Sequence, residues 1–155
     1  MSAVLDQPLY NFRPMAVNDL ENIQIIESEA YEFPWSYFIF EDCLRIGYSC
    51  WVLEENGEII GYAVMTVAAG ECHLLNLCIK HECQHRGFGQ SMLNYLLDVA
   101  CSHGAEVAFL EVRPSNCHAI NLYSKSGFNE VGLRKDYYPA KNGREDAKIF
   151  ARQIT

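Results

Sequence analysis

The sequence predicts one mixed α/β domain, a sheet with helices on both of its faces. Strand-like and helix-like segments follow one another in the order βααβββαβαββ, which favours this class. Half of the 155 residues are hydrophobic and 21% are charged, a composition typical of a globular chain that buries a core. The sequence has no internal repeat, low-complexity tract or proline-rich linker, so we expect a single domain over residues 1–155.

The first helix follows a short strand expected near residues 11–14. We expect Asn18 to cap this helix, with Glu21 completing a capping-box-like pair. The segment that follows places apolar residues three and four positions apart, as on one face of a helix: Leu20, Ile23, Ile26 and Ala30.

A second helix is expected over residues 37–45, because Pro34 and Ser36 break the chain and restart it. Asn56-Gly57 is then a strong hairpin signal. It separates two strand-like segments, 48–54 and 58–68.

The second half of the chain alternates strands and helices. Gly127 is expected to close the second of its helices. The expected segments are a strand at 71–79, a helix to about residue 103, a strand at 105–112, a helix at 119–126, and strands near 129–133 and 146–153.

A glycine-rich turn, Gln84-His85-Arg86-Gly87-Phe88-Gly89, joins the strand at 71–79 to the helix that follows. Backbone N–H groups at a helix N-terminus lack intrahelical partners, and the helix dipole favours negative charge there. Gly87 and Gly89 have no side chain, so a phosphate can approach the main chain closely. The turn therefore predicts a site for a phosphorylated cofactor. The alternative is a glycine turn that only starts a helix.

Two common phosphate motifs do not fit this turn. A P-loop needs Lys-Ser/Thr after the second glycine, where this chain has Gln90-Ser91. A dinucleotide fingerprint needs a third glycine at the position of Met92. The remaining pattern, Gln-x-x-Gly-x-Gly, resembles the pyrophosphate-binding signature of the GNAT superfamily of N-acetyltransferases.

A second motif supports this resemblance. Residues 116–128 follow the pattern Asn-x-x-Ala-x-x-Leu-Tyr-x-x-x-Gly-Phe, which is similar to the second half of the cofactor site in that superfamily. Four further segments resemble the ribosomal-protein-alanine N-acetyltransferase family: 33–36, 110–116, 136–139 and 143–147. The resemblance covers nearly the whole chain and implies a GNAT-type fold, with a mixed and mostly antiparallel sheet.

The resemblance implies acetyl-CoA as cofactor, used as a co-substrate. The strand before the glycine turn would splay from the next strand and pair with the pantetheine arm through backbone groups, one of which would stabilise the oxyanion. Main-chain N–H groups of the turn would hold the pyrophosphate. The implied cofactor-binding residues are Leu77, Cys78, Ile79, His85, Arg86, Gly87, Phe88, Gly89, Gln90 and Asn116. An ordinary buried strand at 77–79 and a plain helix N-cap at Asn116 are compatible with these roles.

Two side chains are implied to be catalytic. Glu111, at the end of an apolar strand, is the expected general base, acting directly or through water. An ion pair with Arg113, or plain solvation, is the alternative for this carboxylate. Tyr123 is the expected general acid, because a phenol can donate a hydrogen bond or a proton to a thiolate leaving group. Its alternative is a core tyrosine near Phe128.

Two aromatic segments resemble the flanks of the acceptor groove in that family. Phe33 and Trp35 precede the second helix, and Tyr137 and Tyr138 lie near the end of the chain. Aromatic residues with neighbouring prolines can form a rigid wall for a peptide substrate. Packing of each side chain beneath its own loop is an equal alternative.

Charge and cysteine content limit the other functions. The net charge of −8 disfavours direct nucleic-acid binding and suits a basic protein substrate. No apolar run approaches the ~20 residues of a membrane span, and the seven scattered cysteines indicate a reduced, cytoplasmic chain. No metal is expected, since four neighbouring Cys and His residues lack the usual zinc-ligand spacing: Cys78, His81, Cys83 and His85.

The resemblance implies that this chain is an acetyl-CoA-dependent N-acetyltransferase that modifies a protein N-terminal α-amine. The expected acceptor is the N-terminal alanine of a small-subunit ribosomal protein. Transfer is expected to be direct, in a ternary complex, with Cys78 and Cys117 dispensable as nucleophiles. Two alternatives remain: a small-amine or lysine N-acetyltransferase on the same fold, and a non-catalytic acetyl-CoA-binding module.

Overall fold

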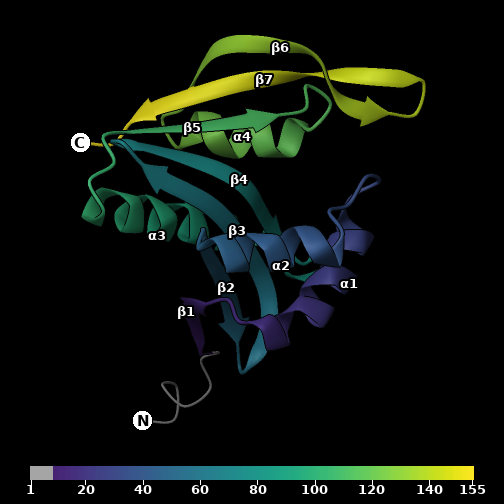
Figure 1. Cartoon of the computed structure of the whole chain (residues 1–155), viewed down its shortest axis with the longest axis vertical. Helices are drawn as coiled ribbons and strands as arrows, with labels where there is room; N and C mark the ends of the chain where they lie inside the picture. Colours follow the sequence, from purple (N-terminus) through teal and green to yellow (C-terminus); the bar gives the residue numbers. More distant parts are fainter. Residues whose placement is uncertain (1–8) are drawn as a thin grey trace. The chain divides into compact units, whose positions relative to one another are not determined.

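The computed structural model describes residues 9–155, which form seven strands, four α-helices and two short 3-10 helices (Figure 1). The first eight residues of the predicted domain lie outside this range. In chain order the elements are β1 (Tyr10–Pro14), η2 (Val17–Asp19), α1 (Leu20–Ala30), α2 (Tyr37–Ile46), β2 (Ser49–Glu55), β3 (Glu58–Ala68), β4 (Glu71–Ile79), η3 (His81–Cys83), α3 (Phe88–Ser102), β5 (Val107–Val112), α4 (Cys117–Lys125), β6 (Asn129–Ala140) and β7 (Gly143–Gln153). The predicted order of helices and strands is confirmed.

The strands are hydrogen-bonded in the order β1-β2-β3-β4-β5-β7-β6. β2 runs antiparallel to β1, and β7 runs antiparallel to both β5 and β6. β4 and β5 are parallel, because α3 carries the chain back between them. The predicted fold class, a mixed and mostly antiparallel sheet, is therefore confirmed.

The chain divides into two compact units. Of the described residues, the first unit contains 9–64 and 77–88, and the second contains 65–76 and 89–155. Strands β3 and β4 each contribute residues to both units. A single domain over the whole chain stays a prediction.

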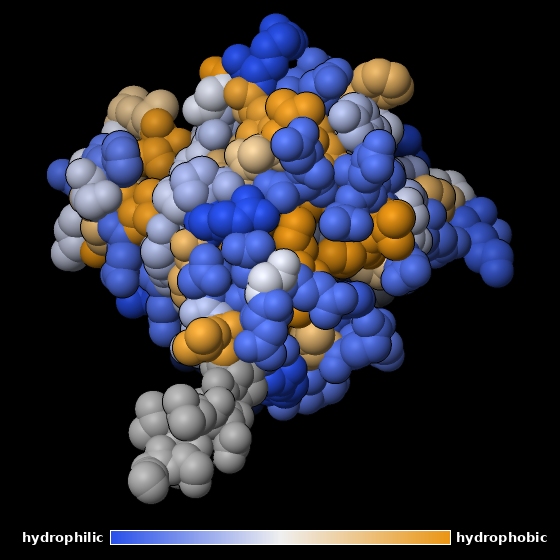
Figure 2. All heavy atoms as spheres, turned by 90° about the horizontal axis from the view of Figure 1, so that it is seen from below, coloured by the Kyte–Doolittle hydropathy of each residue, from blue (hydrophilic) through white to orange (hydrophobic). Residues whose placement is uncertain are grey.

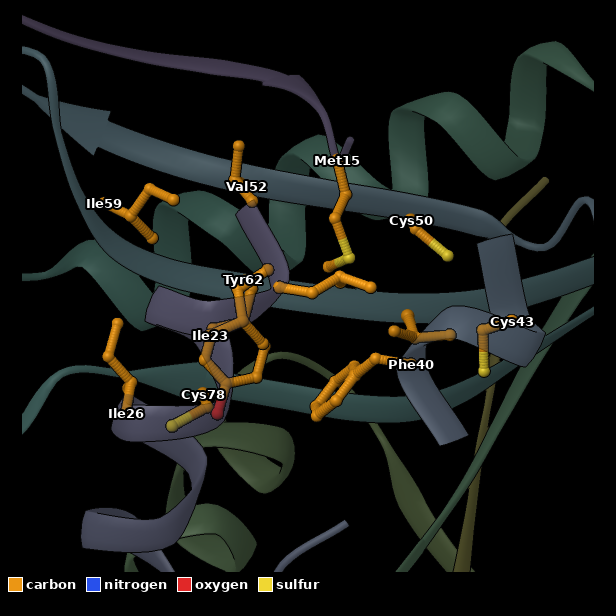
Figure 3. Close-up of a cluster of buried hydrophobic side chains, with 12 residues drawn as sticks. Met15, Ile23, Ile26, Phe40, Cys43, Cys50, Val52, Ile59, Tyr62 and Cys78 are labelled. Atoms are coloured by element: carbon orange, nitrogen blue, oxygen red, sulfur yellow. The ribbon is translucent and has the colours of Figure 1, made fainter. Parts of the chain in front are cut away.

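The first unit is built around an apolar core formed by two helices and three strands (Figure 3). Helical spacing directs the apolar side of α1 to this core, and α2 adds a second apolar patch, so both helices cover the same face of β2, β3 and β4 (Figure 1). The core residues are Met15, Leu20, Ile23, Ile26, Phe40, Cys43, Cys50, Val52, Ile59, Tyr62, Val64 and Cys78.

Most ends of the helices and strands lie where local sequence signals predicted them. Ser36 caps α2 by accepting the Ile39 N–H at 3.4 Å, and Asn56 and Gly57 both adopt the positive φ of a two-residue hairpin turn. Gly127, at φ +87°, follows the end of α4. The segment from 71 to 79 is β4, as predicted.

The start of α1 was predicted wrongly. The helix begins at Leu20, directly after the 3-10 turn, so Asn18 is not its cap. The carboxylate of Asp19 instead accepts the Ala16 N–H at 2.8 Å and closes this turn. Asp19, rather than Asn18, precedes the helix because its carboxylate also binds Arg13 of β1. This contact joins two segments of the chain, and local helix patterns do not encode it.

The two final strands are longer than predicted, because β6 continues through a bulge to Ala140. The register shifts between Arg134 and Tyr138, and Asp136 has a φ of +51°. Arg144 of β7 binds the carbonyl oxygens of Asp136 and Tyr137 at 2.8 and 2.9 Å. A bulge interrupts the regular alternation of side chains along a strand, so the residues after Leu133 do not show a continuous strand pattern.

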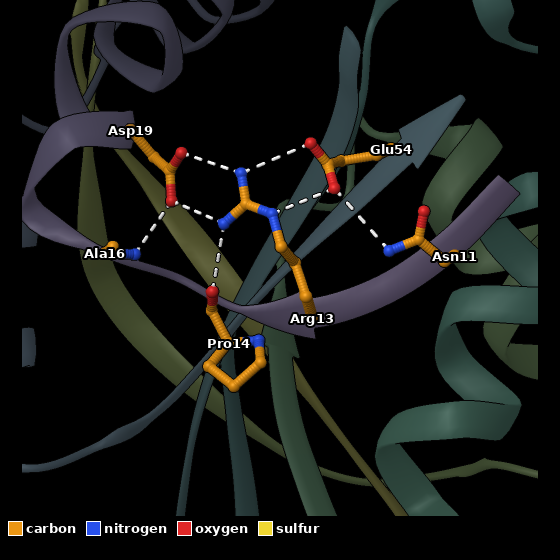
Figure 4. Close-up of polar contacts among 6 residues, drawn as sticks. All are labelled: Asn11, Arg13, Pro14, Ala16, Asp19 and Glu54. Carbon is orange, nitrogen blue, oxygen red and sulfur yellow. Dashed lines mark hydrogen bonds and ion pairs between the residues drawn. The ribbon is translucent and has the colours of Figure 1, made fainter. Parts of the chain in front are cut away.

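Arg13 of β1 joins three elements of the first unit (Figure 4). Its two terminal nitrogens each bind a carboxylate oxygen of Asp19 at 2.8 Å, and Nε lies 2.9 Å from a carboxylate oxygen of Glu54 in β2. The hydrogen bond from Arg13 is the main reason that the pKa of Asp19 is lowered. This network fixes the entry into α1 against the first two strands.

Gly61 of β3 lies where β4 leaves little room for a side chain. A Cβ atom there would be 2.7 Å from Ile79 Cδ1 and 3.0 Å from the carbonyl oxygen of Cys78. The Ile79 atom can move, whereas the Cys78 oxygen belongs to the main chain. Beside them, the Lys80 N–H donates to the carbonyl oxygen of Ile60 at 2.7 Å. Glycine thus permits the close approach of the two strands.

The described residues carry a mixed surface. On the face shown in Figure 2, hydrophobic side chains form several groups among hydrophilic ones. Within residues 9–155, no helix combines the length and the apolar character needed to cross a membrane.

Replacement of Asp19 by asparagine is expected to lower the free energy of unfolding by about 1–3 kcal/mol near neutral pH, the usual range for hydrogen bonds to a charged group. Because the folded-state pKa of Asp19 is depressed, its contribution is complete above the unfolded pKa of about 3.9 and is lost as pH falls through the lower folded value. Urea unfolding at a series of pH values checks this. The difference between Asp19→Asn and the unmodified protein should shrink in acid, and a constant difference would contradict the ion pair.

Gly61→Ala is expected to lower the free energy of unfolding by about 1–3 kcal/mol, as overpacking usually does. The added methyl group must push the main chain of β4 away from β3 at Cys78. Urea unfolding measures the loss, and hydrogen exchange locates it, since the Lys80 N–H should exchange faster. Unchanged stability and unchanged exchange would show that the added methyl group fits without separating the two strands.

Candidate active site

The predicted site residues divide between the two units. The first unit contains Phe33, Trp35, Leu77, Cys78, Ile79, His85, Arg86, Gly87 and Phe88. The second contains Gly89, Gln90, Glu111, Asn116, Tyr123, Tyr137 and Tyr138.

The end of β4 is tied to the glycine turn in the first unit. Gln84, the first residue of the motif, donates from Nε2 to the carbonyl oxygen of Ile79 at 3.0 Å. The 3-10 turn between them is closed by the Cys83 N–H, which donates to the Lys80 carbonyl oxygen at 2.9 Å. Sequence reasoning gave Gln84 no role of its own, although its place in the motif was a signal.

The glycine turn has the backbone geometry of an anion site. His85 and Gly87 have φ values of +63° and +83°, and successive N–H groups in such turns point into a common concavity. A Cβ atom on Gly87 would meet no atom within 4 Å, and one on Gly89 would meet only a Leu122 methyl group at 3.5 Å. Helix α3 begins at Phe88, so its first N–H groups lack intrahelical partners. These residues fit the phosphate groups of a cofactor.

Arg86 does not offer an uncompensated charge at this turn. Its guanidinium binds both carboxylate oxygens of Glu55 at 3.0 and 2.6 Å and lies 4.7 Å from the centre of the Phe88 ring. The pKa of Glu55 is lowered by this hydrogen bond. Main-chain N–H groups and the helix dipole, rather than this guanidinium, are therefore the available anion ligands.

The last residues of β4 are held from α1 and from the core. The Tyr31 hydroxyl donates to the Leu77 carbonyl oxygen at 3.3 Å. Cys78 is buried in the core, and burial raises the pKa of its thiol to about 11. A thiol with that pKa stays protonated near neutral pH and is a poor nucleophile.

Phe33 and Trp35 lie in the loop between α1 and α2. The Trp35 ring packs against the core, with its centre 5.3 Å from that of Phe40. Phe33 is 39% exposed. Trp35 thus has the packed position that was one alternative for these residues.

In the second unit, β4 and β5 are paired only over their first residues. The parallel ladder runs from the Glu71 and Val107 pair to the Leu74 and Leu110 pair. Both strands continue beyond this point, and β5 stays paired with β7 up to Val112. Glu111 therefore lies in β5 just after the ladder with β4 has ended.

Glu111 is paired, although not with the predicted partner. Its carboxylate binds Nε of Arg134 at 2.9 Å, whereas Arg113 binds Glu145 at 3.1 Å. The hydrogen bond to Glu111 is the main cause of the raised pKa of Tyr137. The partner expected as the alternative, Arg113, is thus replaced by Arg134 of β6, because Arg113 lies just past the end of β5 and binds Glu145 of β7 instead.

The bulge of β6 presents the two tyrosines beside this carboxylate. Their ring centres are 5.0 Å apart and nearly perpendicular. Arg113 lies 4.4 Å from the centre of the Tyr138 ring and donates to the carbonyl oxygen of Pro139 at 2.7 Å. Burial raises the pKa of Tyr138 to about 12. The turn before α4 is attached to the same structure, since the Ser115 N–H donates to Glu145 at 3.0 Å.

Tyr123 is 7% exposed and packs edge-on against Phe128, with ring centres 5.8 Å apart. Burial, with a smaller contribution from Tyr138, raises the pKa of its phenol well above the usual value. Asn116 caps α4 by accepting the Ala119 N–H at 3.2 Å. Gln90 of α3 accepts the hydroxyl of Ser126 at 3.0 Å, which joins the two helices.

No group of three or more His, Cys, Asp or Glu side chains among the described residues could hold a metal ion. The four Cys and His residues near the glycine turn therefore do not converge on one point.

Comparison with known proteins identifies the family. The sequence matches the acetyltransferase (GNAT) family over residues 16–128. It is 37% identical over 141 residues to the ribosomal protein bS18-alanine N-acetyltransferase of Escherichia coli (strain K12), covering 91% of this chain and 95% of the relative. The protein of the same name from Haemophilus influenzae is 39% identical over 134 residues, covering 86% and 91%.

The fold agrees with a solved structure from the same group. The crystal structure of the ribosomal-protein-S18-alanine N-acetyltransferase from Escherichia coli matches with a TM-score of 0.88 and 35% identity, and the match covers 95% of each chain. Both units of this chain are therefore included in the likeness. The chain belongs to the GNAT family of acetyltransferases, and it is an N-acetyltransferase.

Proposed function

We propose that this chain transfers the acetyl group of acetyl-CoA to the N-terminal α-amine of a ribosomal protein, with the alanine of bS18 as its acceptor. One observation carries this proposal: the identity of 37% to an enzyme of that name extends over 91% of this chain and 95% of the relative. Fold alone does not choose the acceptor. Identity at this level along nearly the whole chain also includes the loops that would contact the acceptor.

The glycine turn and the end of β4 are proposed to hold the cofactor, which supplies an activated acetyl thioester. The positive φ values of His85 and Gly87 and the open space at Gly87 support phosphate binding by main-chain N–H groups. Pairing of β4 with β5 ends at Leu74, so main-chain groups farther along β4 can pair with an extended ligand arm. Leu77, Cys78 and Ile79 are the residues proposed for this pairing.

Glu111 is proposed to accept the proton of the acceptor amine, directly or through water. The α-amino group of a protein has a pKa near 8. Near neutral pH, only modest help from a nearby carboxylate is therefore needed to remove its proton. The Arg134 guanidinium at 2.9 Å and the Tyr137 hydroxyl fix the orientation of this carboxylate. Glu111 is thereby positioned before the acceptor arrives.

Tyr123 is proposed to donate a hydrogen bond to the sulfur that leaves. Burial raises the pKa of its phenol, so the hydroxyl stays protonated near neutral pH. A free thiol has a pKa of about 8.5, and a phenol that holds its proton more tightly stabilises the thiolate mainly by hydrogen bonding. Direct transfer from thioester to amine fits this arrangement, because the buried thiol of Cys78 is protonated.

The acceptor assignment is tested by release of free thiol from acetyl-CoA. A hexapeptide that begins Ala-Arg should be acetylated rapidly, and a copy with a blocked N-terminus should not, because the reaction needs a neutral α-amine. Polyamines and peptides with free lysine side chains serve as controls for the alternative acceptors. Equal rates with the blocked peptide, or faster rates with polyamines, would refute α-amine specificity.

Glu111→Gln is expected to lower kcat by about 10²-fold or more, the usual contribution of a proton-transferring side chain. Tyr123→Phe removes a hydrogen-bond donor to the developing thiolate and is also expected to lower kcat by about 10²-fold or more. The Kd of acetyl-CoA should change little, since neither side chain is proposed to hold the cofactor. Tyr48→Phe, at a partly buried position packed against the core of the first unit, is the control for loss of a phenol hydroxyl. Turnover of Tyr123→Phe equal to that of the control would remove Tyr123 from the mechanism.

A further inference from the structure

A buried carboxylate of α1 holds the loop that carries Phe33 and Trp35, and the chemistry proposed above does not use it. Glu27 is 2% exposed, although a buried carboxylate is costly unless it is hydrogen-bonded. Its Oε2 accepts the main-chain N–H of Trp35 at 2.9 Å, and its Oε1 accepts the hydroxyl of Tyr62 at 2.8 Å. One carboxylate thus ties the loop to β3, where Tyr62 lies within the core (Figure 3).

Gln24, one helical turn before Glu27, binds the other main-chain group of Trp35. Its Nε2 donates to the Trp35 carbonyl oxygen at 2.9 Å. Residues three positions apart lie on the same side of a helix, so both side chains reach one segment of the loop. We define the Trp35 clamp as Gln24, Glu27 and the main chain of Trp35.

The clamp leaves one polar atom unsatisfied. Oε1 of Gln24 is buried and has no hydrogen-bond partner among the described residues. Turning the amide over would place this oxygen against the Trp35 carbonyl oxygen, so two acceptors would face each other. The bond to Trp35 therefore fixes the amide orientation in spite of its cost, and such exceptions in a folded protein call for an explanation.

The end of α1 also reaches the strand proposed to hold the cofactor. Tyr31 follows the last turn of α1, and its N–H donates to the carbonyl oxygen of Glu27 at 3.1 Å. Its hydroxyl donates to the carbonyl oxygen of Leu77 in β4 at 3.3 Å. One helix end therefore fixes both the loop of Trp35 and the last part of β4.

We propose that Glu27 and Gln24 are positioning residues that hold the loop of Phe33 and Trp35 as a preformed wall for the acceptor peptide. This inference rests on the proposed function and on the expectation from the sequence that this loop flanks the acceptor. A loop that is ordered before binding does not have to be ordered by the peptide, so less of the contact energy is lost. The clamp lowers the KM for the peptide and leaves the transfer step unchanged.

Three substitutions separate this role from a structural or chemical one. Glu27→Met removes both acceptor atoms while keeping an unbranched side chain. Glu27→Gln can keep the clamp, because its oxygen can accept the Trp35 N–H and its NH₂ group can donate to the Tyr62 hydroxyl. Ile23→Val, at a fully buried core position of the same helix, is the matched control for lost stability.

Steady-state kinetics with the Ala-Arg peptide should show a peptide KM at least about tenfold higher for Glu27→Met, with kcat and the KM for acetyl-CoA within about threefold. Glu27→Gln and Ile23→Val should stay within about threefold of the unmodified protein in all three constants. Loop order is read separately. In a Trp51→Phe background Trp35 is the remaining one of the two tryptophans, and acrylamide should quench its fluorescence more strongly only in Glu27→Met.

An unchanged peptide KM and unchanged quenching in Glu27→Met would overturn the proposal. So would an equal loss of kcat in Glu27→Met and Glu27→Gln, because the charge of Glu27 would then matter rather than its hydrogen bonds. If Glu27→Met does not fold, Gln24→Met removes the other half of the clamp and carries the same expectations. If the unmodified protein acetylates no peptide with a free N-terminus, the proposed function is refuted. Quenching of Trp35 fluorescence still decides whether the clamp orders the loop.

Discussion

Strand β4 loses its pairing with β5 after Leu74, and the polar groups of its later residues need other partners. The first unit supplies several of them around the last three residues of the strand. Gly61 allows β3 to approach closely, Tyr31 binds the carbonyl oxygen of Leu77, and Gln84 binds that of Ile79. These contacts fix a segment of extended backbone in the first unit, and the glycine turn follows it directly. The geometry proposed for the cofactor depends on this support.

The anion site proposed at the glycine turn relies on backbone groups rather than on side-chain charge. Arg86 is the cation of the glycine turn, and Glu55 compensates it with two short hydrogen bonds. The attraction for phosphate then comes from N–H groups at the start of α3 and from the left-handed residues of the turn. Such a site does not depend on the net charge of the chain, which is −8. An acidic protein can therefore bind an acidic cofactor and still attract a basic protein substrate.

The acid and base candidates have different surroundings in the second unit, and this suits their different tasks. Tyr123 is buried against Phe128, and burial keeps its phenol protonated. Glu111 instead lies beside two polar groups, the guanidinium of Arg134 and the hydroxyl of Tyr137. The bulge of β6 contributes to this difference, because it brings the tyrosine pair to Glu111.

The sequence by itself determined the order of elements, the Asn56-Gly57 hairpin, the glycine turn and most helix ends, because these features depend on residues close together in the chain. It also indicated the family. Binding of a phosphate by main-chain N–H groups requires only a few glycines at fixed spacing, and such a motif can be seen in the sequence. Only the tertiary structure decided which side chains meet. Arg134 rather than Arg113 pairs with Glu111, and Glu27 of α1 is drawn into the core by Tyr62 and the N–H of Trp35. Such partners lie on different elements, and their contact depends on strand register and helix packing, which no local pattern encodes.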